Sequence, residues 1–121
     1  MWRKLSTPRP SSELLRWWAA SPTASQLAAV RAFIETTPAI LTALDEALTA
    51  ANWEAVGDAA HHLKSSLDGL GVESLRHVIR EVEAYGDAAP EPAHAAQQVT
   101  RVRSTTEQVM AALRHEFPEQ Q

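Results

Sequence analysis

The sequence predicts an all-α protein, an antiparallel up-down four-helix bundle with a short extra N-terminal helix. Apolar residues recur every three or four positions in four long stretches, which is the period of an amphipathic helix. Alanine, leucine, glutamate and arginine are abundant, whereas aromatic residues make up only 6% of the chain. The connections are short, and short connections place successive helices antiparallel.

Length and composition limit the possible classes of protein. With 121 residues, the chain is most simply one domain with one core. It has no cysteine, which excludes disulfides and thiolate metal sites and suits a reducing compartment. No apolar run approaches the roughly 20 residues that span a bilayer, and residues 1–12 lack the apolar centre of a signal peptide. We therefore expect a cytoplasmic protein without a membrane partner.

The first twelve residues differ from the rest in charge. Arg3, Lys4 and Arg9 give these twelve residues a charge of +3. Since the whole chain has a formal charge of −4, the remaining residues carry −7. That remainder repels nucleic acid, so no nucleic-acid partner is expected. Residues 1–12 also contain two prolines and no apolar period, which predicts a flexible basic arm, followed by a single helical domain over residues 13–121.

Residues 13–20 form the short extra helix of the prediction, entered through Ser11 or Ser12. Trp17 and Trp18 either cover one end of the core or form an exposed surface for a partner protein.

The next helix begins with a capping box, Thr23-Ala24-Ser25-Gln26. The pair Thr37-Pro38 predicts either a kink or a new helix capped by Thr37, because proline suits a first turn and disrupts a helix interior. The buried face is then continued by a helical series, namely Ile40, Leu41, Leu44 and Leu48.

The central helix is capped by Asn52 and ends in two glycines. We expect Gly69 and Gly71 to end it by adopting positive φ, and Ser66 to let a neighbouring helix approach closely. One face carries an apolar stripe that packs in the core, made of Trp53, Val56, Ala60, Leu63, Leu67 and Leu70.

A tight turn joins this helix to the next, which contains Leu75 and Tyr85 and stops at Gly86. A proline-bearing loop over residues 86–92 follows. The last helix runs up to Pro118 and is expected to be the longest.

His61 points well away from the apolar stripe of the central helix, at about 100° per residue. Gly57, Asp58, Lys64, Ser65 and Asp68 share its side. An exposed imidazole beside a cation, with little side-chain bulk at Gly57 and Ser65 one turn away, suits a nucleophile that accepts an anionic group from another protein.

These residues resemble the histidine-containing phosphotransfer (HPt) domains of multistep phosphorelays. The family pattern is a histidine, any residue, a hydrophobe, lysine, usually glycine, small residues, then a hydrophobe and glycine. The run from His61 to Ser66, followed by Leu70-Gly71, fits it. Ser65 stands where glycine is usual, and Leu67 where a small residue often sits. Only the first histidine is in register, so the resemblance gives the phosphoacceptor role to His61 rather than His62, and phosphoryl stabilisation to Lys64.

The resemblance further implies a phosphorelay intermediate that exchanges a phosphoryl group between His61 Nε2 and the aspartates of response-regulator receiver domains. A hybrid histidine kinase is the other implied partner. Mg²⁺ is supplied by the receiver, so this chain binds no cofactor itself, and a monomer is expected. Asp58, Ser65 and Asp68 contribute to partner binding together with Gly57.

Other chemistries lack their motifs. The chain has no Gly-rich phosphate loop for a kinase and no Gly-x-Ser-x-Gly elbow for a serine hydrolase, so we expect no autonomous enzyme activity. His61 and His62 are adjacent and point about 100° apart, so they could hardly chelate one metal ion together, and no metal site is predicted.

One alternative function stays open at this stage. The chain could be a helical interaction module that binds a receiver or another protein without carrying phosphate. Trp2, Trp17, Trp18 and the basic arm would then matter more than His61. Dimerisation through an exposed apolar face is a further possibility.

Overall fold

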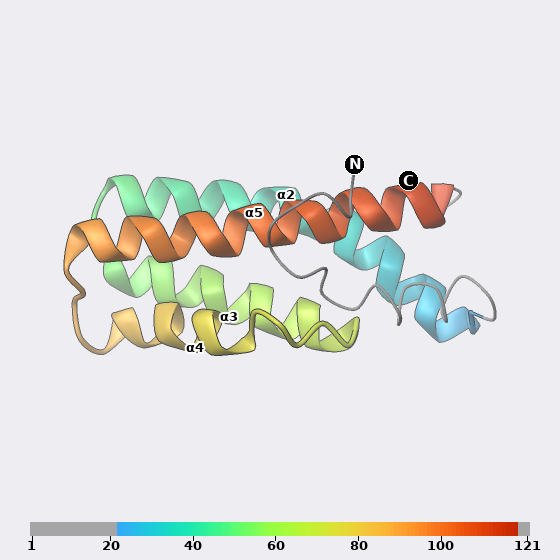
Figure 1. Ribbon diagram of the computed structural model, residues 1–121, viewed down its shortest axis with the longest axis horizontal. Coiled ribbons are helices and arrows are strands. Elements are labelled where there is room, and N and C mark those ends of the chain that lie inside the picture. The colour runs from blue at the N-terminus through green and yellow to red at the C-terminus, as the bar shows by residue number, and fades with distance from the viewer. Residues whose placement is uncertain (1–21, 119–121) are drawn as a thin grey trace.

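The computed structural model describes residues 22–118, and within that range all regular structure is helical. Four α-helices follow one another and confirm the predicted all-α class. Figure 1 shows them side by side along the long axis, with the chain passing back and forth between the two ends. The predicted arm over residues 1–12 and the predicted helix over residues 13–20 lie outside the described residues. The helices are α2 (Ala24–Thr49), α3 (Trp53–Gly69), α4 (Arg76–Glu83), which continues into the 3₁₀ turn η2 (Ala84–Gly86), and α5 (Pro92–Glu116).

Helix α2 begins at the predicted capping box. Thr23 Oγ1 accepts a hydrogen bond from the Gln26 N–H at 3.1 Å, and Gln26 Oε1 accepts one from the Thr23 N–H at 2.7 Å. Pro38 lies inside the helix, so the kink is correct and a new helix at Thr37 is wrong. In Figure 1 the first part of α2 (blue) runs obliquely to the rest, as expected where proline removes a backbone donor.

The unbroken α2 also corrects the expected order of helix lengths. It has 26 residues against 25 in α5, so the last helix is not the longest. One missing hydrogen bond bends a helix whose buried face continues on both sides of the proline, and packing of that face keeps the helix in one piece.

The ends of α2 and α3 have the same geometry. Ala51 (φ 53°) and Gly71 (φ 77°) follow these helices in the left-handed region. The N–H of the next residue then bonds back into the helix, from Asn52 to the Ala47 carbonyl at 2.9 Å and from Val72 to the Leu67 carbonyl at 3.0 Å. This is the Schellman arrangement, which usually has glycine at the left-handed position.

Gly69 does not take the role expected of it. Of the two glycines at the end of α3, Gly71 adopts positive φ, whereas Gly69 is the last residue of the helix and faces open space. One left-handed residue is enough to reverse the chain, so the second glycine has no such task.

The core lies between the four helices and contains the predicted stripe of α3. Trp53, at the start of that stripe, is half-buried and packs edge-on against Tyr85, with ring centroids 6.1 Å apart. Burial of these side chains fixes the rotation of α3, and therefore which of its residues face outward. Its buried apolar side chains are Val56, Ala59, Ala60, Leu63 and Leu67, with Leu70 and Val72 in the following turn.

Helix α2 is, within residues 22–118, the one helix long and apolar enough to cross a membrane by length and composition. This differs from the expectation that no apolar stretch is long enough to span a bilayer, because polar residues interrupt the apolar ones along α2. Val30, Phe33, Leu41 and Leu44 of this helix are buried in the bundle core. We therefore assign α2 to the core.

Candidate functional site

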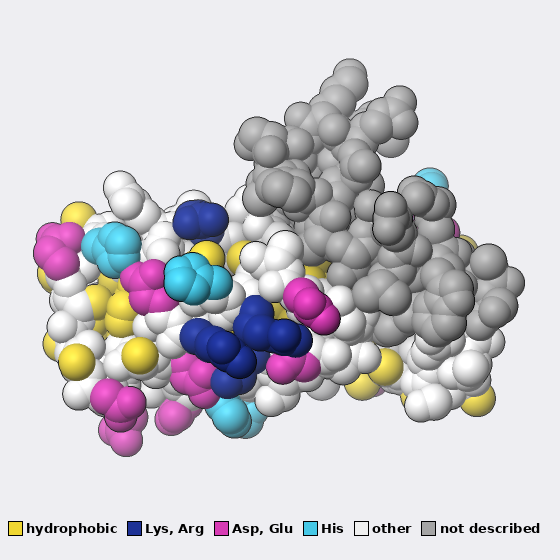
Figure 2. All heavy atoms as spheres, turned by 60° about the horizontal axis from the view of Figure 1, so that its bottom comes forward, with side chains coloured by type: hydrophobic (Ala, Val, Ile, Leu, Met, Phe, Trp, Pro, Cys, Tyr) yellow, Lys and Arg dark blue, Asp and Glu magenta, His cyan; other side chains and the backbone are white. Residues whose placement is uncertain are grey.

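His61 lies on the outer side of α3. The residues on either side of it along the core face, Ala60 and Leu63, have no exposed surface, whereas the His61 side chain is 58% exposed. Lys64, one turn later, lies on the same side and is 24% exposed. The predicted placement of both residues is confirmed. Figure 2 shows charged and histidine side chains near one another on this face of the molecule.

A third residue joins the pair, and the sequence analysis missed it. Glu83, at the end of α4, accepts from both neighbours. Its Oε2 lies 2.6 Å from His61 Nδ1, and its Oε1 lies 2.7 Å from Lys64 Nζ. The carboxylate is 28% exposed, so water screens the interaction only in part. One carboxylate thus fixes both the imidazole and the ammonium group.

This contact determines which ring nitrogen of His61 carries the proton and which keeps its lone pair. The hydrogen bond from Lys64, and secondly that from His61, hold the pKa of Glu83 below its ordinary value, so its carboxylate is ionised at neutral pH. An ionised carboxylate only accepts hydrogen bonds, so Nδ1 of His61 carries the proton. In the neutral ring the lone pair is then on Nε2. Within residues 22–118 no hydrogen bond occupies that nitrogen.

Gly57 does not lie on the open approach to His61, and this expectation is wrong. It is buried, and a Cβ atom added there would lie 2.8 Å from the Glu83 carbonyl oxygen. The reason is that α3 packs closely on the end of α4 at this point, one turn before His61. Gly57 therefore has a packing role, since it lets the backbone of Glu83 come near enough for its side chain to reach the imidazole.

The other residues named on this side of α3 are exposed. Asp58 and Ser65 face solvent, in agreement with the sequence analysis. Asp68 is exposed too, and its Oδ1 accepts a hydrogen bond from Arg76 Nη2 of α4 at 3.2 Å. Their contact with a partner stays a prediction.

His62 and Ser66 lie on a different flank of α3. His62 is exposed, and its ring centroid is 6.2 Å from that of His61. Ser66 Oγ donates to the His62 carbonyl one turn back, at 3.2 Å. The expected close approach of a helix at Ser66 stays a prediction.

Comparison with known families identifies the family of the chain. The family model described as Hpt domain matches residues 28–116. The chain belongs to the Hpt domain family. Domains of this family act in phosphorelays, in which a phosphoryl group passes through a histidine, and they interact with receiver domains and histidine kinases. No curated protein and no solved structure matches the chain.

This Hpt domain contains a second carboxylate cluster, which the sequence analysis also missed. Glu81 of α4 faces α5. Its Oε2 lies 2.6 Å from His94 Nε2 and accepts from the Tyr85 hydroxyl at 3.0 Å, while its Oε1 accepts from Gln98 Nε2 at 2.8 Å. The hydrogen bonds from Gln98 and then His94 hold the pKa of Glu81 below its ordinary value. The cluster joins α4, η2 and α5.

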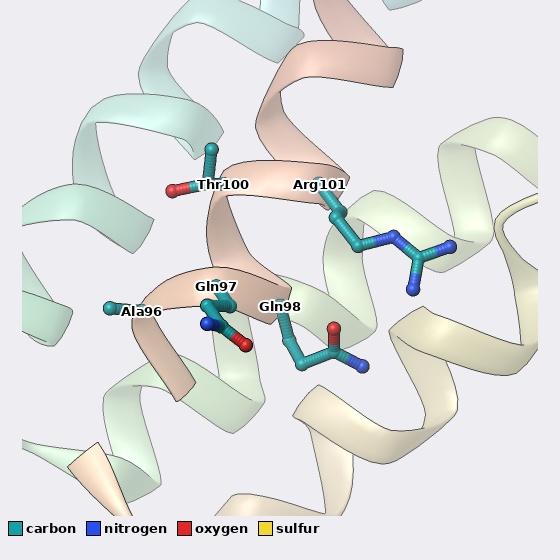
Figure 3. A pocket seen from close by; sticks show the side chains of 5 residues that line it. All are labelled: Ala96, Gln97, Gln98, Thr100 and Arg101. Carbon is teal, nitrogen blue, oxygen red and sulfur yellow. The ribbon is translucent and has the colours of Figure 1, made fainter. Parts of the chain in front are cut away.

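Two further features of the Hpt domain do not contribute to the His61 site. A shallow pocket is lined by α5 alone, with Gln98 and Arg101 projecting from the same stretch of helix (Figure 3). In the described part of the chain, no group of three histidine or acidic side chains is arranged to hold a metal ion.

The signal that could have revealed Glu83 is the hairpin formed by α3 and α4. His61 and Glu83 are equally far along the chain from Val72, which lies in the turn between the two helices. In a helical hairpin, residues equidistant from the turn lie opposite each other. An acidic residue at that distance therefore predicts a partner for the histidine.

Proposed function

We propose that this Hpt domain carries a phosphoryl group on Nε2 of His61 and exchanges it with the aspartate of a receiver domain. The observation that supports this most strongly is the hydrogen bond between His61 Nδ1 and Glu83, because it leaves the outward nitrogen as the nucleophile. We also propose that the four helices form an antiparallel up-down bundle.

Transfer begins with the Nε2 lone pair, which attacks the phosphorus atom of the receiver's acyl phosphate. The new N–P bond forms as the P–O bond to the aspartate breaks, and the electron pair goes to the aspartate carboxylate. Lys64 offsets charge on the transferred oxygens. An ammonium group at 4 Å contributes about 1 kcal/mol when fully hydrated and about 4 when partly shielded, so it assists the step without driving it.

The partner supplies the rest of the chemistry. Phosphoryl transfer depends on positioning and charge stabilisation, so a rigid helix that presents one imidazole is enough on this side. The receiver contributes Mg²⁺, and a hybrid histidine kinase is the upstream source. The domain itself has no kinase activity and acts as a cytoplasmic monomer, with Asp58, Ser65 and Asp68 in contact with the partner. Its bounds are residues 13–121, after a basic arm over residues 1–12.

The test is transfer of labelled phosphoryl from a phosphorylated receiver domain in the presence of Mg²⁺. Wild-type protein and the adjacent control His62→Gln take up label, and His61→Gln takes up none. Retention of label by His61→Gln would disprove the assignment. Circular dichroism checks that the His61→Gln variant is still helical, which excludes unfolding as the reason for the missing label.

A further inference from the structure

Glu83 contacts both residues of the proposed transfer site. It binds His61 and Lys64 with separate oxygens, at 2.6 and 2.7 Å, and Gly57 allows its backbone to approach α3. A neutral acceptor would be sufficient to orient the ring. A carboxylate adds a negative charge beside Nδ1, and that charge matters most when the ring itself becomes positive.

We propose that Glu83 is a positioning residue that keeps the Nδ1 proton on His61 in the phosphorylated state, so that the phosphohistidine stays in its readily transferred form. This inference depends on the proposed function of His61. It concerns the lifetime of the phosphorylated domain and the pH range over which it donates.

The proton and electron balance shows why the Nδ1 proton matters. After Nε2 is phosphorylated, the ring with its Nδ1 proton carries a positive charge. When a receiver carboxylate attacks phosphorus, the N–P bond breaks, its electron pair returns to Nε2, and neutral imidazole leaves with the Nδ1 proton still in place. Without that proton the leaving group would be an imidazolate anion, which departs far more slowly. No proton moves during transfer in either direction.

Among residues 22–118, Glu83 is the one acceptor that the structure places on Nδ1 of His61. From α3 the ring is faced by Lys64 and by the His62 ring, and Asp58 lies on the same side. From α4 it is faced by Glu83. The hydroxyl of Tyr85 in η2 bonds Glu81 instead.

Lys64 connects the two states. In the unphosphorylated protein its ammonium group bonds Glu83 Oε1 and offsets the carboxylate charge. A phosphoryl group on Nε2 brings about one and a half to two negative charges to the same side, and these attract the ammonium group away. Glu83 then bonds the imidazole and no longer the ammonium group. Its effect on the Nδ1 proton is therefore larger after phosphorylation than before.

The experiment compares Glu83→Gln with wild type after both are phosphorylated by phosphoramidate, a small donor that needs no receiver. The lifetime of phosphohistidine is followed by ³¹P NMR across the pH range. An adjacent carboxylate shifts a proton equilibrium by about 1 to 3 units, and we take the lower end because the ring is largely exposed. The Glu83→Gln half-life is then about tenfold longer than wild type on the alkaline side of the profile.

Glu81→Gln is the matched control, because it removes a carboxylate from the same helix that also bonds a histidine, but on the α5 side. Its phosphohistidine profile coincides with that of wild type. Superimposable profiles for Glu83→Gln and wild type would overturn the inference. If His61 takes phosphoryl from phosphoramidate and none from a phosphorylated receiver, the proposed function fails, while the role of Glu83 is still measured.

A second measurement needs no variant. The ring nitrogens of ¹⁵N-labelled phosphorylated wild type are titrated by NMR in the folded state and in urea. The inference predicts that the folded protein keeps the Nδ1 proton to a higher pH than the unfolded one, by about one unit. Equal midpoints would contradict it.

Discussion

Glu81 and Glu83, two residues apart on α4, form contrasting clusters with the helices on either side. Both accept a hydrogen bond from a histidine ring at 2.6 Å. The ring nitrogens differ, since His61 uses Nδ1 and His94 uses Nε2. The remaining donors differ too, because Lys64 brings a positive charge to Glu83, whereas the neutral groups of Gln98 and Tyr85 bond Glu81.

The contrast shows that two histidines paired with carboxylates can differ in the nitrogen they leave open and in the charge beside them. His94 is about as exposed as His61, at 51% against 58%, so access does not separate them. Because Nε2 of His94 bonds Glu81, only Nδ1 is left as a possible nucleophile. Nδ1 lies next to the residue's own Cβ and backbone and is therefore crowded. It also has no ammonium group among its partners in the described structure. We infer that the Glu81 cluster fastens α4 to α5, whereas the proposed transfer chemistry belongs to the Glu83 cluster.

The largest expected effect is on the transfer rate after loss of the cation. Lys64→Ala slows transfer from a phosphorylated receiver by about tenfold, since roughly 1.4 kcal/mol of charge stabilisation corresponds to that factor. Gln98→Ala, which removes the corresponding donor from the other cluster, leaves the rate unchanged. Rapid-quench kinetics measure both rates. An unchanged rate in Lys64→Ala would remove its proposed role.

The next effect is on the free energy of unfolding. Here the larger loss is expected at the Glu81 cluster, whereas the larger effect on the transfer rate is expected at the Glu83 cluster. Glu81→Ala strands the Gln98 side chain and the Tyr85 hydroxyl, both in buried residues, so the free energy of unfolding falls by about 2 kcal/mol. Glu83→Ala costs about 1 kcal/mol or less, because His61 and Lys64 can turn to water. Urea denaturation measures both. A larger loss for Glu83→Ala would contradict the division of roles.

Both clusters weaken in acid. The pKa of each carboxyl is lowered in the folded protein, so each contributes stability that is fully present above its ordinary pKa and is lost as the pH falls through the folded value. The free energy of unfolding therefore declines as the pH drops below about 4.5, the ordinary value of both groups. The double variant with glutamine at positions 81 and 83 has a shallower decline in urea titrations. An equal slope would count against the two ion clusters.

The smallest effect is spectroscopic. Burial, and then the hydrogen bond to Glu81, raise the pKa of Tyr85 to about 12. The neutral phenol is favoured in the folded state, so its stabilising contribution is present below the ordinary value of about 10 and is lost as the pH rises toward 12.

The chain has one tyrosine, so absorbance at high pH reports on this group alone. Glu81→Gln lowers the midpoint of its ionisation in part, because burial remains the larger cause, and Glu83→Gln does not move it. A midpoint near 10 in the folded wild type would show that Tyr85 does not bond Glu81 as described.

The sequence predicted the elements whose causes are local. The capping groups of Thr23 and Asn52 and the left-handed Gly71 are short-range features, and the apolar stripe of α3 fixes the outward direction of His61 and Lys64. What depends on two helices meeting could not be predicted in this way. Glu83 and the packing role of Gly57 appear only when the end of α4 is placed against α3. Ala51 was missed because its left-handed turn is imposed by the tight connection and not by its residue type.

The most direct test of the account is the position of the phosphoryl group on the ring. Uniformly ¹⁵N-labelled protein is phosphorylated by a phosphorylated receiver domain with Mg²⁺, and its histidine ring nitrogens are observed by NMR. We expect phosphorus on Nε2 of His61 with a proton on Nδ1, and an unmodified His94. Phosphorus on Nδ1 of His61, or on any other histidine, would contradict it.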